Sequence, residues 1–187
     1  KGIDTTTGPL GQGMATAVGR AMTERQMAGR YGDDLVNHHT YVVAGDGCLM
    51  EGVSHEAASM AGHMKLGRLI VLFDDNSISI DGSTDLSTSD DIHGRFEAYG
   101  WQVLSCDGHD MDAVSAAISA AQADDRPSLI CCKTTIGLGA PNKQGTSGVH
   151  GAPLGDAEIA LARETRGWAH PAFEIPADIL AEWRAVG

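Results

Sequence analysis

The sequence is poor in positive charge and in aromatic side chains, and it has no long apolar run. Its 187 residues include 13 Lys or Arg against 25 Asp or Glu, which gives a formal net charge of −12. Proteins that bind nucleic acid or membrane surfaces need clustered Lys and Arg, so this charge argues against both classes of partner. No apolar stretch approaches the roughly 18 residues of a membrane span, and Lys1 to Asp4 does not begin a signal peptide. We therefore expect a cytoplasmic protein without a nucleic-acid or membrane partner.

Cysteine is also scarce, and its spacing does not suit a metal site. The four cysteines include no pair with CxxC spacing. They lie in or beside expected strands, so we interpret them as reduced core thiols. They are Cys48, Cys106, Cys131 and Cys132. With 42% hydrophobic residues, a chain of this length can bury one sizeable core.

Short β-rich runs alternate with helical stretches along the chain. Alternation at this rhythm predicts an α/β fold, a doubly wound, mostly parallel sheet with helices on both faces. The expected strands cover 41–44, 69–73, 102–106 and 128–135, and the expected helices cover 11–29, 51–66 and 91–99, with a further helix opened by Asp110 and Asp112.

Apolar residues at helical spacing predict which faces enter the core. In the helix over 51–66 this face would be Val53, Ala57, Met60 and Met64, and in the helix after Asp110 it would be Met111, Val114, Ile118 and Ala121. The remaining stretches are expected to be polar loops over 74–89 and 137–148 and two helices near 156–166 and 177–185.

A carboxylate and an amide follow two successive apolar runs. Gly45-Asp46-Gly47 ends the first run, and Asp74-Asp75-Asn76 ends the second. The helix between them would be the crossover of one βαβ unit, so Asp46 and Asn76 would lie at adjacent strand ends. The crevice at the carboxyl ends of parallel strands is where such sheets hold metals and phosphates.

Asp46 and Asn76 suit a hard divalent cation. Mg²⁺ and Ca²⁺ prefer oxygen donors, and Mg²⁺ usually takes few protein ligands and completes its shell with water and phosphate. Gly47 would leave its backbone N–H open to an anion. The spacing therefore predicts a clamp for a diphosphate and its Mg²⁺ or Ca²⁺.

Further motifs surround this clamp. The first part of the clamp continues as Gly45-Asp46-Gly47-Cys48-Leu49-Met50-Glu51-Gly52, and the motifs Gly8-Pro9-Leu10-Gly11-Gln12-Gly13 and His150-Gly151-Ala152-Pro153 lie upstream and downstream. Together with Asp74-Asp75-Asn76 they resemble the thiamine-diphosphate enzymes of the transketolase family. A diphosphate motif alone would fit many thiamine enzymes, whereas the upstream and downstream motifs are similar to transketolases in particular. The resemblance covers nearly the whole chain.

The resemblance assigns roles to the matching positions. It implies that Asp46 and Asn76 ligate the ion through their side chains and Ile78 through its backbone carbonyl. It implies two catalytic residues, His150 at the substrate channel and Glu51 in a carboxylate relay toward a partner subunit. The implied cofactor-binding residues are Gly8, Leu10, Gly47, Ile80, Ile136 and His150.

The activity that the resemblance implies is that of a transferase of the pentose phosphate pathway. A transketolase moves a two-carbon ketol unit from a ketose phosphate to an aldose phosphate, with thiamine diphosphate and Mg²⁺ as cofactors. Two alternatives stay open. One is a dihydroxyacetone synthase or another thiamine-diphosphate enzyme, and the other is the non-catalytic half of a split transketolase.

The resemblance also bears on domain organisation. It places residues 1–187 in a single diphosphate domain with the thiamine-diphosphate-binding fold, in which 155–187 form a helical tail. In the family the cofactor lies between this domain and a pyrimidine domain of another subunit. We expect the chain to lack its upstream start and the pyrimidine and C-terminal domains. We therefore expect it to be inactive alone and to need a homodimer or a pyrimidine-domain partner.

Overall fold

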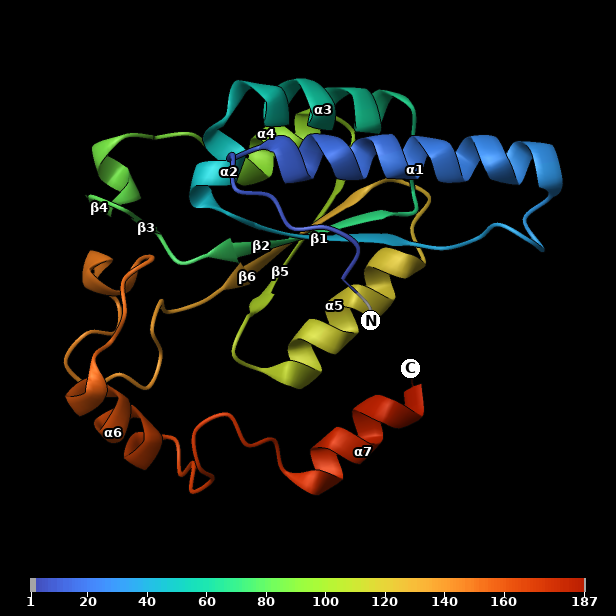
Figure 1. Cartoon of the computed structure of the whole chain (residues 1–187). Coiled ribbons are helices and arrows are strands. Elements are labelled where there is room, and N and C mark those ends of the chain that lie inside the picture. The colour runs from blue at the N-terminus through green and yellow to red at the C-terminus, as the bar shows by residue number, and fades with distance from the viewer. Residues whose placement is uncertain (1–2, 187) are drawn as a thin grey trace. The chain divides into compact units, whose positions relative to one another are not determined.

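The computed structural model describes residues 3–186, which divide into two compact units (Figure 1). One unit is Thr7–Thr134 and contains the main sheet. The other contains the described residues on either side of it, 3–6 and 135–186. The expectation of a single domain over 1–187 stays a prediction. Within the described range, no helix combines the length and the apolar character that crossing a membrane requires.

The larger unit is built on a four-stranded parallel sheet, which confirms the expected α/β fold. The strands lie in the order β1-β2-β6-β5, and each neighbouring pair is parallel. Their central residues are almost all apolar because a parallel sheet is covered on both faces. The strands are β1 (Thr40–Gly45), β2 (Leu69–Asp75), β5 (Gln102–Asp107) and β6 (Ser128–Lys133).

Helices cover both faces of this sheet (Figure 1). From β1 through β2 to β5 the chain crosses the sheet in one direction, and α3 and α4 lie on one face, with α1 beside α3. From β5 to β6 the chain steps back, and α5 lies on the opposite face. This change of face follows because connections between parallel strands are right-handed. The helices are α1 (Gln12–Tyr31), α2 (Asp46–Met50), α3 (Gly52–His63), α4 (Ile92–Ala98) and α5 (Met111–Gln122).

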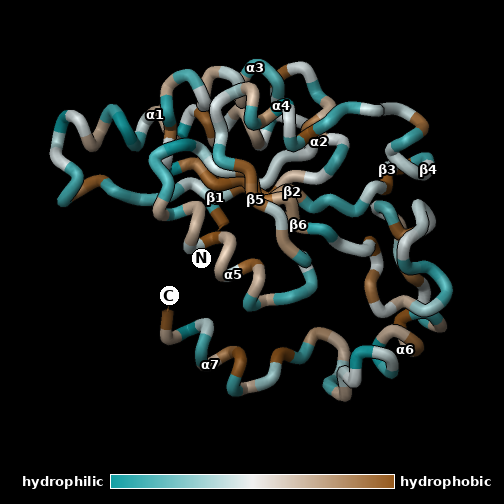
Figure 2. The backbone as a smooth tube through the Cα atoms, turned by 180° about the vertical axis from the view of Figure 1, so that it is seen from behind, coloured by the Kyte–Doolittle hydropathy of each residue, from teal (hydrophilic) through white to brown (hydrophobic). Residues whose placement is uncertain are grey.

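Alternate strand residues enter two separate core clusters, one on each side of the sheet. In β2, Leu69 and Val71 belong to the cluster that includes residues of α1, α3 and α4, whereas Ile70 belongs to the cluster that includes Ala121 of α5. Figure 2 shows the strands at the centre of this unit as a concentration of hydrophobic residues. The two clusters fix the register of the sheet, because a slip by one residue would exchange them.

The cysteines are free, and two of them lie in these clusters. Cys131 and Cys132, at successive positions of β6, are buried on opposite faces of the sheet. Burial raises the pKa of both thiols to about 12, so they stay neutral. Cys48 and Cys106 are half-buried and pack against the same two clusters, so the expectation of core thiols is confirmed in full for the β6 pair and in part for these two.

The connection between β1 and β2 contains the helix expected over 51–66, which is α3, and a second helix that was not expected. A short helix, α2, begins at Asp46 directly after β1 and ends at Met50. Glu51 has extended backbone angles, φ −70° and ψ 138°, and α3 begins at Gly52. The prediction missed α2 because Gly45-Asp46-Gly47 has the composition of a turn.

α3 buries small residues in place of the expected apolar stripe. Side chains this small let neighbouring backbone approach closely: a Cβ added at Gly62 would lie 1.8 Å from the carbonyl oxygen of Tyr99. In α5, Ala121 of the expected face is buried but Met111 is exposed. The residues that α3 buries are Ser54, Ala57, Ala58, Ala61 and Gly62, whereas Val53, Met60 and Met64 of the expected face are exposed.

The remaining elements are short or lie in the smaller unit. The polar loop expected over 74–89 contains a two-stranded hairpin followed by a short 3₁₀ helix. The helices expected near 156–166 and 177–185 are present. These elements are β3 (Ile78–Ser79), β4 (Gly82–Ser83), η1 (Thr84–Leu86), η2 (Ser147–Val149), α6 (Asp156–Thr165) and α7 (Ala177–Val186).

Candidate metal and diphosphate site

The ends of β1 and β2 bring Asp46 and Asn76 together. Gly45 pairs in register with Asp74; Asp46 is the next residue after Gly45, and Asn76 lies two residues after Asp74. The backbone N–H of Asn76 hydrogen-bonds to the carbonyl oxygen of Asp74, and it lies close enough to the Asp46 carboxylate to help lower the pKa of that carboxyl. The adjacency expected from the spacing of the two motifs is therefore what this sheet produces.

The Asp46 carboxylate is held in an unfavourable environment. Its Oδ2 atom is buried and has no hydrogen-bond partner among residues 3–186. Burial raises the pKa of this carboxyl, and the nearby charges of Asp75 and Asp74 raise it further. A buried carboxylate oxygen without a partner fits a cation site, because a cation would supply the missing interaction.

The Asn76 side chain is oriented by hydrogen bonds on both sides of its amide. Its Nδ2 donates to Asp74 Oδ2 at 3.1 Å, and its Oδ1 accepts from the backbone N–H of Ile78 at 2.9 Å. Thr134 Oγ1 donates to Asp74 Oδ1, which fixes that carboxylate in turn. An amide oxygen can accept twice, so Asn76 Oδ1 keeps acceptor capacity for an ion.

The loop after Asn76 is also anchored to the sheet. Lys133 Nζ, at the end of β6, lies 3.2 Å from Asp75 Oδ1 and 2.9 Å from Ser77 Oγ. Ser77 has a left-handed backbone, φ 60°, and this turns the chain toward Ile78. Ile80, at the tip of the hairpin, is 71% exposed.

No group of three or more His, Cys, Asp or Glu side chains is placed to bind a metal in the described part of the chain. The donor set expected from the sequence is of another kind. It consists of one carboxylate, one amide oxygen and one backbone carbonyl, from Asp46, Asn76 and Ile78. The hard oxygen donors of this set are those that Mg²⁺ and Ca²⁺ prefer.

The loop before α1 lies against α2 and the α2–α3 junction. A Cβ added at Gly47 would come within 3.2 Å of Leu10 Cδ1, and one at Gly11 would lie 2.8 Å from Glu51 Cβ. Gly11 has φ +79°, a conformation that glycine adopts at little cost. The fold therefore gathers Leu10, Gly47 and Glu51, while Gly8 lies exposed in the same loop.

Ile136 and His150 belong to the smaller unit. A Cβ added at Gly137 would lie 3.0 Å from Val149 Cγ2, so the two segments that carry Ile136 and His150 touch each other. His150 is exposed at the end of η2, and Ile136 is half-buried.

Comparison with known proteins identifies the family. The family model for the thiamine diphosphate binding domain of transketolase matches residues 1–186. The chain belongs to the transketolase family. A transketolase from Cereibacter sphaeroides is 65% identical over 183 residues, which cover 98% of this chain and 28% of the relative. A transketolase from Vibrio parahaemolyticus is 61% identical, with the same coverage.

Solved transketolase structures have the same fold. The transketolase from Campylobacter jejuni superposes with a TM-score of 0.94 at 42% identity, covering 97% of this chain and 29% of that one. The transketolase from Leishmania mexicana gives a TM-score of 0.93 at 44% identity, with coverages of 98% and 28%. The chain thus spans about 28% of the length of the curated transketolases that it matches.

The transketolase motifs indicated the residues that are expected to contact a ligand. They did not indicate the residues that orient those side chains. Asp74 stands inside the Asp-Asp-Asn motif, yet its bond to Asn76 was not anticipated. Thr134 lies 60 residues from the Asp74 carboxylate that it contacts, so no local pattern could pair the two.

Proposed function

We propose that this chain supplies the half-site that holds Mg²⁺, or Ca²⁺, and the diphosphate of thiamine diphosphate in a transketolase. The observation that carries the proposal is Asp46 Oδ2, a buried and unpartnered carboxylate oxygen in residues 3–186, at a strand end beside the Asn76 amide. Membership of the transketolase family supports the identity of the cofactor, because the matching domain is described as binding thiamine diphosphate.

The ion would be held by oxygen donors from two strand ends. Asp46 would supply the charge, Asn76 its side-chain oxygen and Ile78 its backbone carbonyl. Gly47, which follows Asp46, would give its backbone N–H to the diphosphate. A side chain at this position would crowd Leu10, since an added Cβ comes within 3.2 Å of Leu10 Cδ1.

Apolar residues would hold the organic part of the cofactor. Leu10 and Ile80 are 53% and 71% exposed, so both apolar side chains are available to contact a ligand. The residues proposed to line the aminopyrimidine and the thiazolium are Gly8, Leu10, Ile80 and Ile136. His150 would reach the diphosphate and the substrate channel, and Glu51 would join a carboxylate relay toward the partner subunit.

Bound thiamine diphosphate supplies the carbon nucleophile that breaks and remakes a carbon–carbon bond beside a ketone, while the protein binds and orients it. The complete protein would use this chemistry to pass a two-carbon ketol unit from a ketose phosphate to an aldose phosphate. Its partner would be a second copy of the protein or a separate pyrimidine domain.

The decisive experiment replaces Asp46 by Asn in the complete protein that contains this chain. The amide keeps the size of the side chain but removes its charge. We expect Mg²⁺-dependent binding of thiamine diphosphate to weaken by more than about 100-fold, because even outer partners of a metal ligand are worth about 10- to 100-fold. Isothermal titration of the cofactor at several Mg²⁺ concentrations measures the effect.

A matched control separates binding from folding. Asp112→Asn makes the same change at an exposed position of α5 and should leave the titration unaltered. Without metal and cofactor, Asp46→Asn should unfold at the same or a higher temperature than the parent, because it removes a buried charge without a counterion. Unaltered Mg²⁺ dependence in Asp46→Asn would contradict the proposal.

The acceptor substrate distinguishes a transketolase from a dihydroxyacetone synthase. We expect the complete protein to use pentose phosphates in preference to formaldehyde as the acceptor of the two-carbon unit. A coupled assay with both acceptors, each at saturating donor, measures the preference.

A further inference from the structure

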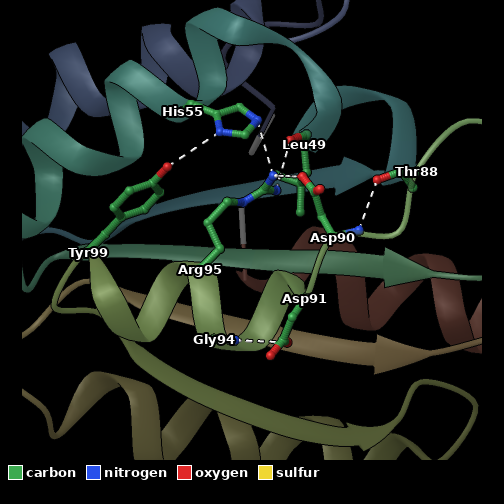
Figure 3. A network of polar contacts seen from close by, with 8 residues as sticks. All are labelled: Leu49, His55, Thr88, Asp90, Asp91, Gly94, Arg95 and Tyr99. Atoms are coloured by element: carbon green, nitrogen blue, oxygen red, sulfur yellow. Dashed lines mark hydrogen bonds and ion pairs between the residues drawn. The ribbon is translucent and has the colours of Figure 1, made fainter.

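Arg95 of α4 joins three elements through hydrogen bonds and an ion pair (Figure 3). Its Nη2 donates to the carbonyl oxygen of Leu49 in α2 at 2.9 Å. Its Nη1 lies 3.1 Å from Nε2 of His55 in α3 and 3.0 Å from Oδ2 of Asp90, in the loop that leads into α4. The Arg95 side chain is only 13% exposed, so these bonds are largely shielded from water.

The partners of His55 identify the form of its ring. Arginine has only donors, so Nε2 of His55 must be the acceptor in the bond with Arg95. The proton of the neutral ring is then on Nδ1, which faces the Tyr99 hydroxyl at 3.4 Å. Each of the two contacts that His55 makes in Figure 3, with Tyr99 and with Arg95, therefore pairs one donor with one acceptor.

The bond to Leu49 matters because α2 is very short. The last carbonyls of a helix have no partner within it and need one from outside. In α2, side chains donate hydrogen bonds to two of these carbonyl groups. Ser54 Oγ donates to the carbonyl oxygen of Cys48 at 2.6 Å, and Arg95 donates to that of Leu49. A cation at a helix C-terminus also interacts favourably with the carbonyl groups there.

Arg95 extends from a well-packed base. Phe96, the next residue, is buried and meets Trp101 edge to face, with ring centroids 5.1 Å apart. The Trp101 indole donates to the carbonyl oxygen of Ala58 in α3 at 2.8 Å. The position of α4 is thus fixed against α3, and Arg95 transmits that position to α2.

We propose that Arg95 is a positioning residue that holds α2 in place, so that Asp46 and Gly47 at its beginning are preorganised for the metal and the diphosphate. This inference rests on the proposed function of the Asp46 site. Arg95 contacts the end of α2, not the expected ligands, and it acts by restraining the short helix that carries them. Its absence would leave the Leu49 carbonyl without this partner and loosen α2.

The test compares Arg95→Met with the parent in the complete protein. We expect the dissociation constant of thiamine diphosphate in the presence of Mg²⁺ to rise about 10-fold, as for other partners that orient ligands. The turnover number at saturating cofactor should fall by a smaller factor. Hydrogen–deuterium exchange should speed up in peptides covering 46–54, whereas peptides of β6 should exchange as in the parent.

Two further variants make the outcome decisive. Arg126→Met removes an arginine that pairs with Asp124 in the turn before β6, and it should change neither binding nor exchange at 46–54. Arg95→Lys keeps one charged donor and should weaken binding by a smaller factor than Arg95→Met. If Arg95→Met does not fold, Arg95→Lys decides, and a parent-like dissociation constant with parent-like exchange would overturn the inference.

Asp46→Asn serves as the reference for the site itself. If it abolishes Mg²⁺-dependent binding while Arg95→Met binds like the parent, the positioning role of Arg95 is wrong and the proposed function stands. If Asp46→Asn binds like the parent, both the proposed function and the inference are wrong.

Discussion

At the scale of single residues, a hydroxyl at one strand end sets the direction of an amide at the next. Thr134 donates to Asp74, and Asp74 accepts from the Asn76 amide nitrogen. The amide nitrogen is thereby engaged, whereas the amide oxygen, which accepts from the Ile78 N–H, keeps its second lone pair for an ion. A carboxylate at position 74 therefore serves orientation, while the one at position 46 would serve binding.

Replacing Thr134 by Val tests this orientation. Valine has nearly the same shape but no hydroxyl, so Asp74 would lose its donor and Asn76 could rotate. We expect Mg²⁺ affinity to fall about 10-fold and the free energy of unfolding to fall by about 1 kcal/mol. Titration of the complete protein with Mn²⁺, followed by electron paramagnetic resonance, measures the affinity.

Thr23→Val is the matched control. The Thr23 hydroxyl donates to the carbonyl oxygen of Gly19 within the exposed surface of α1. Its removal should leave ion affinity unchanged. Equal affinity of the Thr134 and Thr23 variants would contradict the orienting role of Thr134.

At the scale of elements, the α3 helix shows how small residues position a site. Its buried alanines let it pack closely beside α1, and Gly62 leaves room for the backbone that connects α4 to β5. This close packing fixes the distance between α3 and α4, and Arg95 then reaches α2 from α4. Larger apolar residues on the same face would separate these elements.

Substitution of glycine by alanine at two positions tests this packing. Gly62→Ala would place a Cβ 1.8 Å from the Tyr99 carbonyl oxygen, and we expect a loss of about 3 kcal/mol in the free energy of unfolding. Gly19→Ala, on the exposed side of α1, has no atom within 4 Å of the new Cβ. It should stabilise the protein by roughly 0.5–1 kcal/mol, since alanine favours a helix over glycine. Urea unfolding of the two variants beside the parent measures both effects, and a small loss in Gly62→Ala would show that the packing is loose.

At the scale of the whole molecule, the chain accounts for part of a proposed active site. It spans about 28% of the length of the transketolases that it matches. The larger of its two units contains the residues proposed to bind the ion, Asp46, Asn76 and Ile78, together with Gly47 and the exposed side chains of Leu10 and Ile80. His150, which is also proposed to reach the diphosphate, lies in the smaller unit.

We therefore expect the 187 residues by themselves to show no ketol transfer. The resemblance to transketolases implies that the cofactor lies between this domain and a pyrimidine domain, so the 187 residues alone would supply only one side of the cofactor site. A coupled assay of the purified chain, beside the complete protein at equal molar concentration, measures this. Transfer by the chain alone, at a rate comparable with the complete protein, would show that this chain contains a whole active site.

The sequence by itself determined the class of fold, the positions of the four strands of the main sheet and the meeting of Asp46 with Asn76. These follow from local information, because apolar runs and helical spacing report the type of each element and parallel strands end at one edge. The same local information failed for α2, whose residues have the composition of a turn, and for the buried face of α3, where alanine replaces larger apolar residues.

Only the tertiary structure decided which side chains support the site. Thr134 lies 60 residues from Asp74, and Arg95 lies 46 residues from Leu49. Contacts between residues this far apart in the sequence depend on strand register and on how closely helices pack. Neither property can be predicted from a single segment of the sequence. The burial of Asp46 Oδ2 was likewise decided by the tertiary structure. This oxygen is buried, without a hydrogen-bond partner in the described chain, because of how the surrounding elements pack.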